Sequence, residues 1–324
     1  MKLITFKNWF AQLPELSHRQ QERVRQALGP DEPVVPESLQ WLETLPVPAC
    51  PVCQAEHPYR WGYQAGAQRY RCRQCRHTFT ALSGTPLARL RHKARWRAYS
   101  EALQDGLTVR QAALRCGIHK NTSFRWRHRF LVLPADCKAE HLQGIVEADE
   151  TFFAYSCKGQ RHLDRPPRQR GQQIHTRGTG PEQVPVRVVR DRSGATADFQ
   201  LDQDNAPAVT ACLDPLVARD AILCSDGAAV YRSAAHTLGL THRPVNVAQG
   251  IRVIAGVYHI QNVNAYDSRL KTWMKRFHGV ATKYLEHYLG WRRWLERWGQ
   301  DNSPLVGLYA ALGRENQFQR LTQT

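Results

Sequence analysis

The spacing of apolar positions changes along the chain, from helical periodicity in the first half to strand-like runs in the second. Between residues 87 and 130 apolar side chains recur every three or four positions, which predicts helices. After Pro134 short runs of β-branched and apolar residues predict strands. The predicted strands are 144–149, 184–189, 195–201 and 221–224, with helices near 205–217 and from residue 228 onward. Strands and helices mixed in this order indicate an α/β domain.

The part of the chain before residue 87 carries shorter patterns. Residues 3–28 predict two short helices, and the prolines of residues 30–36 mark a linker. Aromatic and basic residues alternate within 59–71, which suits a ribbon of antiparallel strands. Pro86 is expected to begin the first helix of the next module, because proline is favoured at the first helical position.

Residues 107–130 have the pattern of a helix-turn-helix. Small residues suit close helix contact, Gly117 suits the turn, and Phe124 and Phe130 are expected to face the core of the module. The second helix would then present the polar residues Lys120, Asn121, Arg125, Arg127 and Arg129. Such a helix can enter the major groove of DNA. The alternative is an ordinary helical hairpin with a solvated basic face.

The charge of the chain favours a polyanionic partner. The sequence has 45 basic and 28 acidic residues, a formal net charge of +17, and nucleic acid is the commonest partner of such a protein. A generally solvated basic surface is the alternative. The segment 156–183 is rich in arginine and is expected to be a flexible loop that orders on DNA. Because no apolar run approaches the roughly 18 residues of a membrane span and no signal-peptide core is evident, we expect a soluble intracellular protein.

Four cysteines form two CxxC pairs, Cys50–Cys53 and Cys72–Cys75. Two such pairs joined by a short hairpin supply the four sulfur ligands of a structural Zn²⁺ site. Two disulfides are the alternative, but they would need an oxidising compartment that nothing in the sequence indicates. The other five cysteines lack paired spacing and are expected to be small buried residues.

Two aspartates follow predicted strands in the α/β domain. Asp149 ends the first strand and Asp226 follows the last short one, and paired carboxylates at strand ends are well placed to bind divalent cations. Alternatively, Asp226 caps the next helix and Asp149 pairs with an arginine. Glu147 shares the face of Asp149 and Glu150 opposes it, so either could replace Asp149.

A helix near the C-terminal end adds two more candidates. Asn264 and Lys271 are seven residues apart, two helical turns, so both project from one face. Asn264 could lend its carbonyl to a metal, and Lys271 could contact a phosphate near the scissile bond. Asn262 and His259 are alternative third ligands. An aromatic stripe farther on is expected to be core, comprising Tyr284, Tyr288, Trp291, Trp294 and Trp298.

Four segments together resemble bacterial insertion-sequence transposases. They are Val146–Thr151, Cys224–Gly227, His259–Asn264 with Lys271, and Tyr284–Trp291. The resemblance implies an N-terminal zinc ribbon and an RNase H-like domain whose active site is Asp, Asp, Asn and Lys in place of the common Asp, Asp, Glu. The catalytic set implied for this chain is Asp149, Asp226, Asn264 and Lys271, the first three binding Mg²⁺ or Mn²⁺.

We therefore expect a multidomain fold, a zinc ribbon plus an all-α helix-turn-helix followed by an α/β RNase H-like domain with a central mixed sheet. The expected parts are a helical segment 1–40, a ribbon 46–82, a helix-turn-helix 86–133, a catalytic domain 141–300 with the basic insertion 156–183, and a tail 301–324.

The expected function is that of a transposase that binds double-stranded DNA at the terminal inverted repeats. It would cut each 3′ end and join it to target DNA, as a homodimer or higher oligomer at the bacterial nucleoid. A non-catalytic DNA-binding regulator derived from a transposase is the alternative, and a nuclease without strand transfer is a third possibility.

Overall fold

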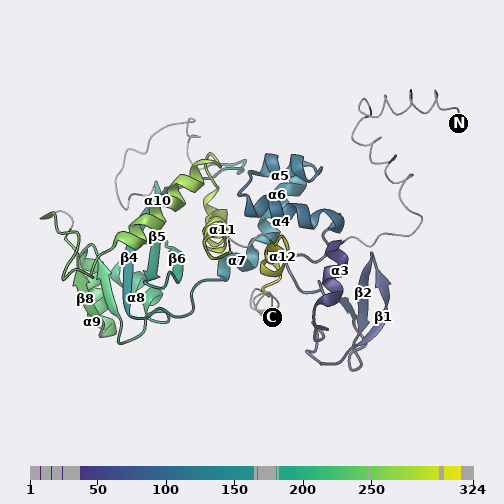
Figure 1. The fold of residues 1–324 in the computed structure, drawn as a ribbon, viewed down its shortest axis with the longest axis horizontal. Coiled ribbons are helices and arrows are strands. Elements are labelled where there is room, and N and C mark those ends of the chain that lie inside the picture. Colours follow the sequence, from purple (N-terminus) through teal and green to yellow (C-terminus); the bar gives the residue numbers. More distant parts are fainter. Residues whose placement is uncertain are drawn as a thin grey trace. The chain divides into compact units, whose positions relative to one another are not determined.

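The computed structural model describes most of the chain in two compact units, Met1–Ala81 and Leu82–Thr324 (Figure 1). The described residues are 8, 16, 24, 37–163, 166, 180, 182–246, 249–298 and 303–314. The expected N-terminal helices, the linker and most of the basic insertion lie outside them. No helix among the described residues is long and apolar enough to cross a membrane.

The first unit contains a three-stranded antiparallel sheet. A helix, α3 (Glu37–Thr44), precedes the strands β1 (Tyr59–Gln64), β2 (Ala67–Arg71) and β3 (Thr78–Thr80). Gly66 has a φ of +79°, which glycine adopts readily at the turn between β1 and β2. Phe79 packs against Tyr70 and two of the paired cysteines in a small core. The strands therefore occupy the segment for which the sequence predicts a ribbon.

The second unit begins with helices. They are the 3₁₀ helix η2 (Lys93–Arg95), α4 (Trp96–Gln104), α5 (Val109–Arg115), α6 (Lys120–Phe130) and α7 (Val132–Asp136). The expectation of a helix from Pro86 is wrong, because Arg89 and His92 take left-handed backbone conformations that a helix does not permit. Thr108 begins α5 with a reciprocal capping box to Gln111.

A five-stranded mixed sheet forms the centre of the α/β part, with the strand order β6-β5-β4-β7-β8. The strands are β4 (Ile145–Ala154), β5 (Gln183–Asp191), β6 (Thr196–Gln200), β7 (Ile222–Ser225) and β8 (Thr241–Pro244). The first three pair antiparallel, while β7 and β8 extend the sheet in parallel with β4. The sequence analysis predicts all of them except β8, whose four residues show no apolar pattern.

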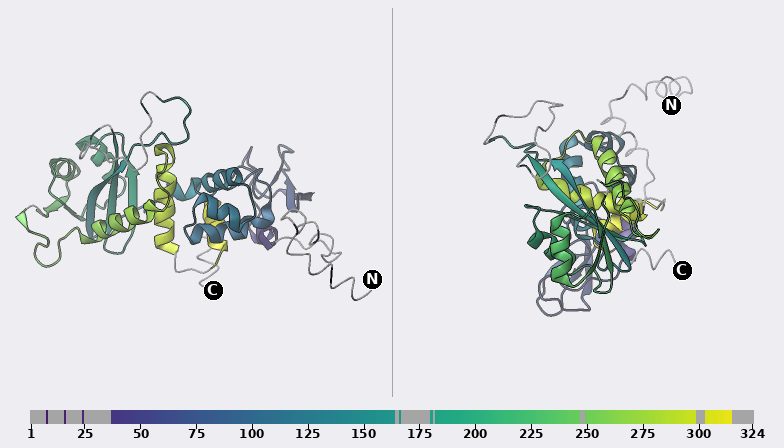
Figure 2. Two further views of the ribbon diagram at one scale, coloured as in Figure 1. Left: turned by 90° about the horizontal axis from the view of Figure 1, so that it is seen from above. Right: turned by 90° about the vertical axis from the view of Figure 1, so that its left-hand side faces the viewer.

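Helices cover both faces of this sheet (Figures 1 and 2). On one face α8 (Ala206–Leu213) and α9 (Ala229–Leu238) share an apolar core with Val146 and Ala148 of β4. On the other face α10 (Gln261–Lys275) packs against β4 and β5. Because strand side chains alternate, the odd-numbered residues of β4 face α10.

The aromatic helix α11 (Leu285–Trp298) connects the α/β part with the preceding helices of the same unit. Trp291 is fully buried and donates its indole N–H to the carbonyl of Leu103 at 3.0 Å. Gly290 packs so closely on α7 that an added Cβ would lie 2.4 Å from the oxygen of Pro134. Tyr288, Trp291 and Trp294 are buried, which confirms the core position expected for these three residues of the aromatic stripe, whereas Tyr284 and Trp298 are half-buried.

The segment expected to be a C-terminal tail is in part a helix. The described residues include α12 (Leu305–Ala311), which packs against α4, and the short 3₁₀ helix η4 (Thr282–Tyr284) precedes α11. Every residue from Val306 to Ala311 is buried. This part of the tail therefore belongs to the core of the second unit, while residues 315–324 lie outside the described residues.

Candidate metal and DNA-binding sites

The register of β4 and β7 brings Asp149 and Asp226 together. The parallel pairing ends with Glu147 opposite Cys224, and each aspartate lies two residues farther along its strand direction. Carboxylate oxygens of Asp149, Glu150 and Asp226 all lie within 4.8 Å of one another. Three carboxylates at one strand edge repel unless a cation lies among them, so the donor set fits Mg²⁺ or Mn²⁺.

The backbone directly after Asp226 turns sharply. Gly227 has a φ of +86°, and a Cβ added there would lie 3.2 Å from Pro244. The amide of Ala228 donates to Oδ1 of Asp226 at 3.0 Å within this turn, but the following helix α9 has no side-chain cap, so the alternative that Asp226 caps it is wrong. The residue is nevertheless exposed, which leaves the carboxylate cluster open to solvent on this side.

The electrostatics of Asp149 reflect this crowding. Burial raises the pKa of Asp149 to about 6, and the negative charges of Glu150 and Asp226 act in the same direction. Burial also raises the pKa of Glu150, and the charge of Asp226 adds to the effect. Among the described residues Asp149 has no ion pair with an arginine, contrary to the alternative interpretation of its role. A bound cation would relieve the repulsion.

Glu150 is held by a buried polar network. Its Oε2 accepts hydrogen bonds from Arg187 at 2.9 Å and from the Tyr231 hydroxyl at 3.0 Å. Arg187 is fully buried and also pairs with Asp204. Such a network fixes a side chain within a narrow range of positions. Of the two glutamates that the sequence left open as substitutes for Asp149, Glu150 lies in the cluster.

Glu147 does not belong to the carboxylate cluster. It is fully buried, and its Oε2 accepts hydrogen bonds from the backbone amides of Asn262 at 2.8 Å and Val263 at 3.0 Å. The side-chain amide of Asn262 donates to Oε1 at 2.9 Å, and His259 and Arg192 lie within ion-pair distance of the same oxygen. Glu147 therefore binds the amino end of α10 and fixes it to β4. Asn262 and His259, the alternative third ligands, both contact Glu147.

Helix α10 aligns Asn264 and Lys271 on one side, and both are exposed. Between them lies Asp267, which is only 7% exposed and which sequence reasoning missed. Burial raises the pKa of Asp267 to about 8, the charge of Asp149 adds to this, and Lys271 opposes it. An acidic residue close to the buried positions Val263 and Leu270 was the available signal.

The four paired cysteines converge in the first unit. All four Sγ atoms lie within 4.8 Å of one another, and the separations Cys50–Cys75, Cys53–Cys72 and Cys53–Cys75 are each 3.5 Å. These distances exceed a disulfide bond of about 2.05 Å, and all four thiols are free. Backbone hydrogen bonds, chiefly that of Cys75, lower the pKa of Cys72 to about 6. The arrangement fits a tetrahedral thiolate-bound metal.

The polar side of α6 differs in part from the expected one. Lys120, Asn121, Arg125 and Arg129 are exposed, but Arg127 is fully buried. Its guanidinium donates to the carbonyl of Leu107 at 2.6 Å and lies 4.6 Å from the ring centre of Trp291. The prediction that α6 presents Arg127 is therefore wrong. Phe124, expected in the core, is 40% exposed and contacts Tyr284.

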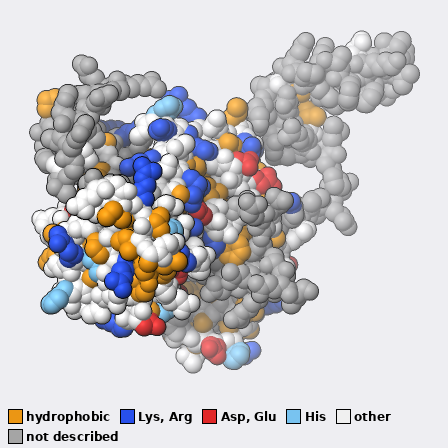
Figure 3. All heavy atoms as spheres, turned by 60° about the vertical axis from the view of Figure 1, so that its left-hand side comes forward, with side chains coloured by type: hydrophobic (Ala, Val, Ile, Leu, Met, Phe, Trp, Pro, Cys, Tyr) orange, Lys and Arg blue, Asp and Glu red, His pale blue; other side chains and the backbone are white. Residues whose placement is uncertain are grey.

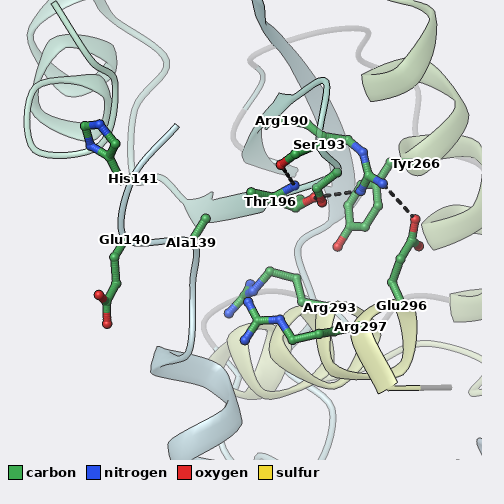
Figure 4. Close-up of a pocket in the computed structure, with 12 residues that line it drawn as sticks. Ala139, Glu140, His141, Arg190, Ser193, Thr196, Tyr266, Arg293, Glu296 and Arg297 are labelled. Carbon is green, nitrogen blue, oxygen red and sulfur yellow. Dashed lines mark hydrogen bonds and ion pairs between the residues drawn. The ribbon is translucent and has the colours of Figure 1, made fainter. Parts of the chain in front are cut away.

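Basic side chains are spread over the face of the molecule drawn in Figure 3, where acidic ones are sparse. A cavity of about 440 Å³ beside β5 and α11 is also rich in arginine (Figure 4). There Arg190 lies 3.3 Å from Glu296, and Arg293 pairs with Asp198, so these charges are neutralised within the protein. None of the three clustered carboxylates lines this cavity. It is therefore separate from the candidate metal site.

Comparison with known proteins supports an assignment of the α/β part. Residues 141–295 match the family described as ISXO2-like transposase domain. These residues are therefore similar to an insertion-sequence transposase domain. The matched residues contain the central mixed sheet that the sequence analysis expected. The three clustered carboxylates lie within the matched residues.

One curated relative also comes from a mobile element. It is described as an uncharacterized protein in transposable element ISH50 of Halobacterium salinarum, and it is 28% identical over 247 residues, 74% of this chain and 82% of the relative. Among solved structures, a pre-cleavage Mos1 transpososome has 14% identity, covers 69% of this chain and 77% of its own, and has a TM-score of 0.28. The Mos1 strand transfer complex has 15% identity, covers 69% and 76%, and has a TM-score of 0.27. Scores this low do not establish a common fold.

Proposed function

We propose that this chain is a metal-dependent DNA transposase that cuts the ends of its element and joins them to target DNA. The observation that carries the proposal is the convergence of Asp149, Glu150 and Asp226 within 4.8 Å inside a transposase domain. Carboxylates from neighbouring strand ends are the ligands that Mg²⁺ and Mn²⁺ require for phosphodiester chemistry. The strongly basic composition supports DNA as the substrate.

Cleavage and joining are both displacements at phosphorus, so one site can perform them in turn. When bound, the cations would activate the attacking oxygen, first of water and then of the DNA 3′ end, and stabilise the leaving oxygen. Asp149 and Asp226 would hold them, with Glu150 kept in place by Arg187 and Tyr231. Lys271, exposed on α10, would contact a phosphate beside the scissile bond, and Asn264 would lie one turn away from Asp267 on the DNA-facing side.

Two parts of the chain are proposed to bind the element ends. Zn²⁺ held by Cys50, Cys53, Cys72 and Cys75 would fix the ribbon of the first unit. The helix α6, with Lys120, Asn121, Arg125 and Arg129 exposed, would enter a major groove as the second helix of a helix-turn-helix. Because two ends must be processed together, we expect at least a homodimer on DNA.

A cleavage assay with a matched pair of aspartates tests the proposal. Asp226 follows β7 and Asp220 precedes it, and both are exposed. The full chain should cut and join DNA carrying the flanking ends of its element in Mg²⁺ or Mn²⁺. Asp226→Ala and Asp149→Ala should bind the same DNA in a gel-shift assay but cut none of it, whereas Asp220→Ala should behave as the wild type. If the wild type binds the ends and never cuts them, the non-catalytic regulator is the correct function.

A further inference from the structure

Asp267, on the buried face of α10, has a carboxyl group whose burial the packing of the fold does not explain. Asp267 is 7% exposed, and its Oδ1 has no hydrogen-bond partner among the residues that the structure describes. An unpaired carboxylate in a protein interior is costly, by several kcal/mol when ionised. Buried carboxyl groups in this unit otherwise have donors, as Glu147 and Asp198 do. Asp267 therefore lacks the partner that its burial requires.

The position of Asp267 indicates what that partner is. The residue follows Asn264 by three positions and precedes Lys271 by four, so it lies on the same side of the helix, turned toward the sheet. Its side chain is buried on the side of α10 that packs against β4, the strand that bears Asp149 and Glu150. Glu147 fixes the amino end of α10 to the same strand that bears Asp149. The approach of Asp267 to the cluster is thus built into the packing of α10 on β4.

We propose that Asp267 is a metal ligand, and that it joins Asp149 in holding a second divalent cation in the role first assigned to Asn264. The inference rests on the proposed function and assigns one more residue to its site. A carboxylate binds Mg²⁺ or Mn²⁺ more tightly than a neutral amide does, and sites with two cations commonly share one carboxylate between them. Asn264 is exposed and stays available to DNA.

The donor set supports two cation positions. Glu150 and Asp226 flank Asp149 on one side, within the 4.8 Å cluster. Asp267 lies outside that cluster on α10, which packs against the face of β4 opposite to Tyr231, the residue that holds Glu150. Asp149 is therefore the carboxylate between the two groups. A cation beside Asp267 would supply the missing partner of its Oδ1 and neutralise its repulsion with Asp149.

Counting bound Mn²⁺ tests the assignment without relying on activity. The purified full chain, with its zinc retained, is titrated with Mn²⁺, and the free ion is measured by its electron paramagnetic resonance signal. The wild type should bind two Mn²⁺, and Asp267→Asn should bind one or lose at least tenfold in affinity for the second. Asn264→Ala and the exposed neighbour variant Ser268→Ala should both bind two. Wild-type Mn²⁺ binding by Asp267→Asn would overturn the inference.

Two further measurements separate the possible failures. If the wild type binds no Mn²⁺, or if Asp149→Asn binds it unchanged, the proposed function itself fails. Thermal unfolding of the zinc-retaining chain without added Mn²⁺ shows whether Asp267→Asn is folded, and its midpoint should not lie below that of the wild type. The rise of the midpoint on adding Mn²⁺ should then be smaller than in the wild type, since fewer ions stabilise the native state. Asp267→Ser, a smaller uncharged replacement, should give the same loss, and an unchanged rise in both variants would refute the assignment.

Discussion

Replacing Glu147 with glutamine tests how the active-site helix is held. Glu147 is fully buried and accepts two backbone hydrogen bonds and one side-chain hydrogen bond at the amino end of α10, at 2.8 to 3.0 Å. Glutamine has nearly the same shape, but it loses the charge and turns an NH₂ group toward one set of donors. If the NH₂ group replaces Oε2, the backbone amides of Asn262 and Val263 lose their acceptor, and if it replaces Oε1, it faces the guanidinium of Arg192.

The magnitude follows from these contacts. A hydrogen bond to a charged group contributes about 1.5–3 kcal/mol and a neutral one about 1 kcal/mol, and an unsatisfied buried donor costs about 1–3 kcal/mol. The favourable interaction of the carboxylate with the helix dipole adds about 0.3–1 kcal/mol. Allowing for non-additivity, Glu147→Gln should lower the free energy of unfolding by about 3 kcal/mol. For a unit of this size the unfolding midpoint should fall by about 6–12 °C.

The assay is thermal unfolding of the full chain in EDTA, with Glu140→Gln as the exposed control. Mn²⁺ binding of Glu147→Gln, measured well below its midpoint, should retain the wild-type number of ions, because Glu147 holds the helix and does not touch the metal. An unchanged midpoint would refute the role of Glu147 in fixing α10. Loss of one Mn²⁺ without loss of stability would instead make Glu147 a ligand, the alternative that the sequence had left open.

Further predictions concern the other sites. Purified protein should contain one Zn²⁺ per chain, and Cys72→Ser should remove most of it in metal analysis; a folded preparation without zinc would contradict the thiolate site. Arg125→Ala should weaken binding to element ends and reduce the salt slope by about 1, whereas Arg127→Ala should lower the unfolding midpoint, because only the former side chain is exposed. Burial and the neighbouring His287 lower the pKa of His128 to about 3, so the unfolded state binds the proton more tightly. The stability contribution of neutral His128 is therefore present above pH 6.5 and lost as the pH falls toward 3, and His128→Gln should show a shallower acid loss in unfolding experiments.

The elements of the α/β domain could be predicted because their apolar patterns are strong and local. Strands β4 to β6 alternate or cluster β-branched residues around a clear turn, and β7 is a short apolar run. The carboxyl ends of β4 and β7 then had to meet if the two strands were parallel neighbours, which is why Asp149 and Asp226 could be paired from the sequence. Strand β8 was missed because it has four residues and its sequence, Thr-His-Arg-Pro, is polar at the edge of the sheet.

The remaining features depend on tertiary contacts that no local pattern encodes. Arg127 lies on the inner side of α6 because the indole ring of Trp291 and the carbonyl of Leu107 supply partners for a buried guanidinium. Strand alternation left both Glu147 and Glu150 open as substitutes for Asp149, but Glu147 faces the amino end of α10 and Glu150 lies in the cluster. Asp267 resembled an ordinary polar residue of a half-buried helix until its burial and its neighbours were known.

Three acidic residues of strand β4 have different environments. This difference explains how a site that is open to solvent can keep a fixed geometry. Glu147 fixes α10, Asp149 belongs to the carboxylate cluster on the side of the strand that faces α10, and Glu150 is tied to α9 through Tyr231. The strand is paired on both sides, to β5 and β7, so none of the three can shift without disturbing the sheet. Asp226 follows the last residue of the short strand β7 and is exposed, so the cluster is open to solvent on this side. Rigidity therefore comes from the centre of the sheet, while exposure to solvent comes from the carboxyl end of the short strand β7.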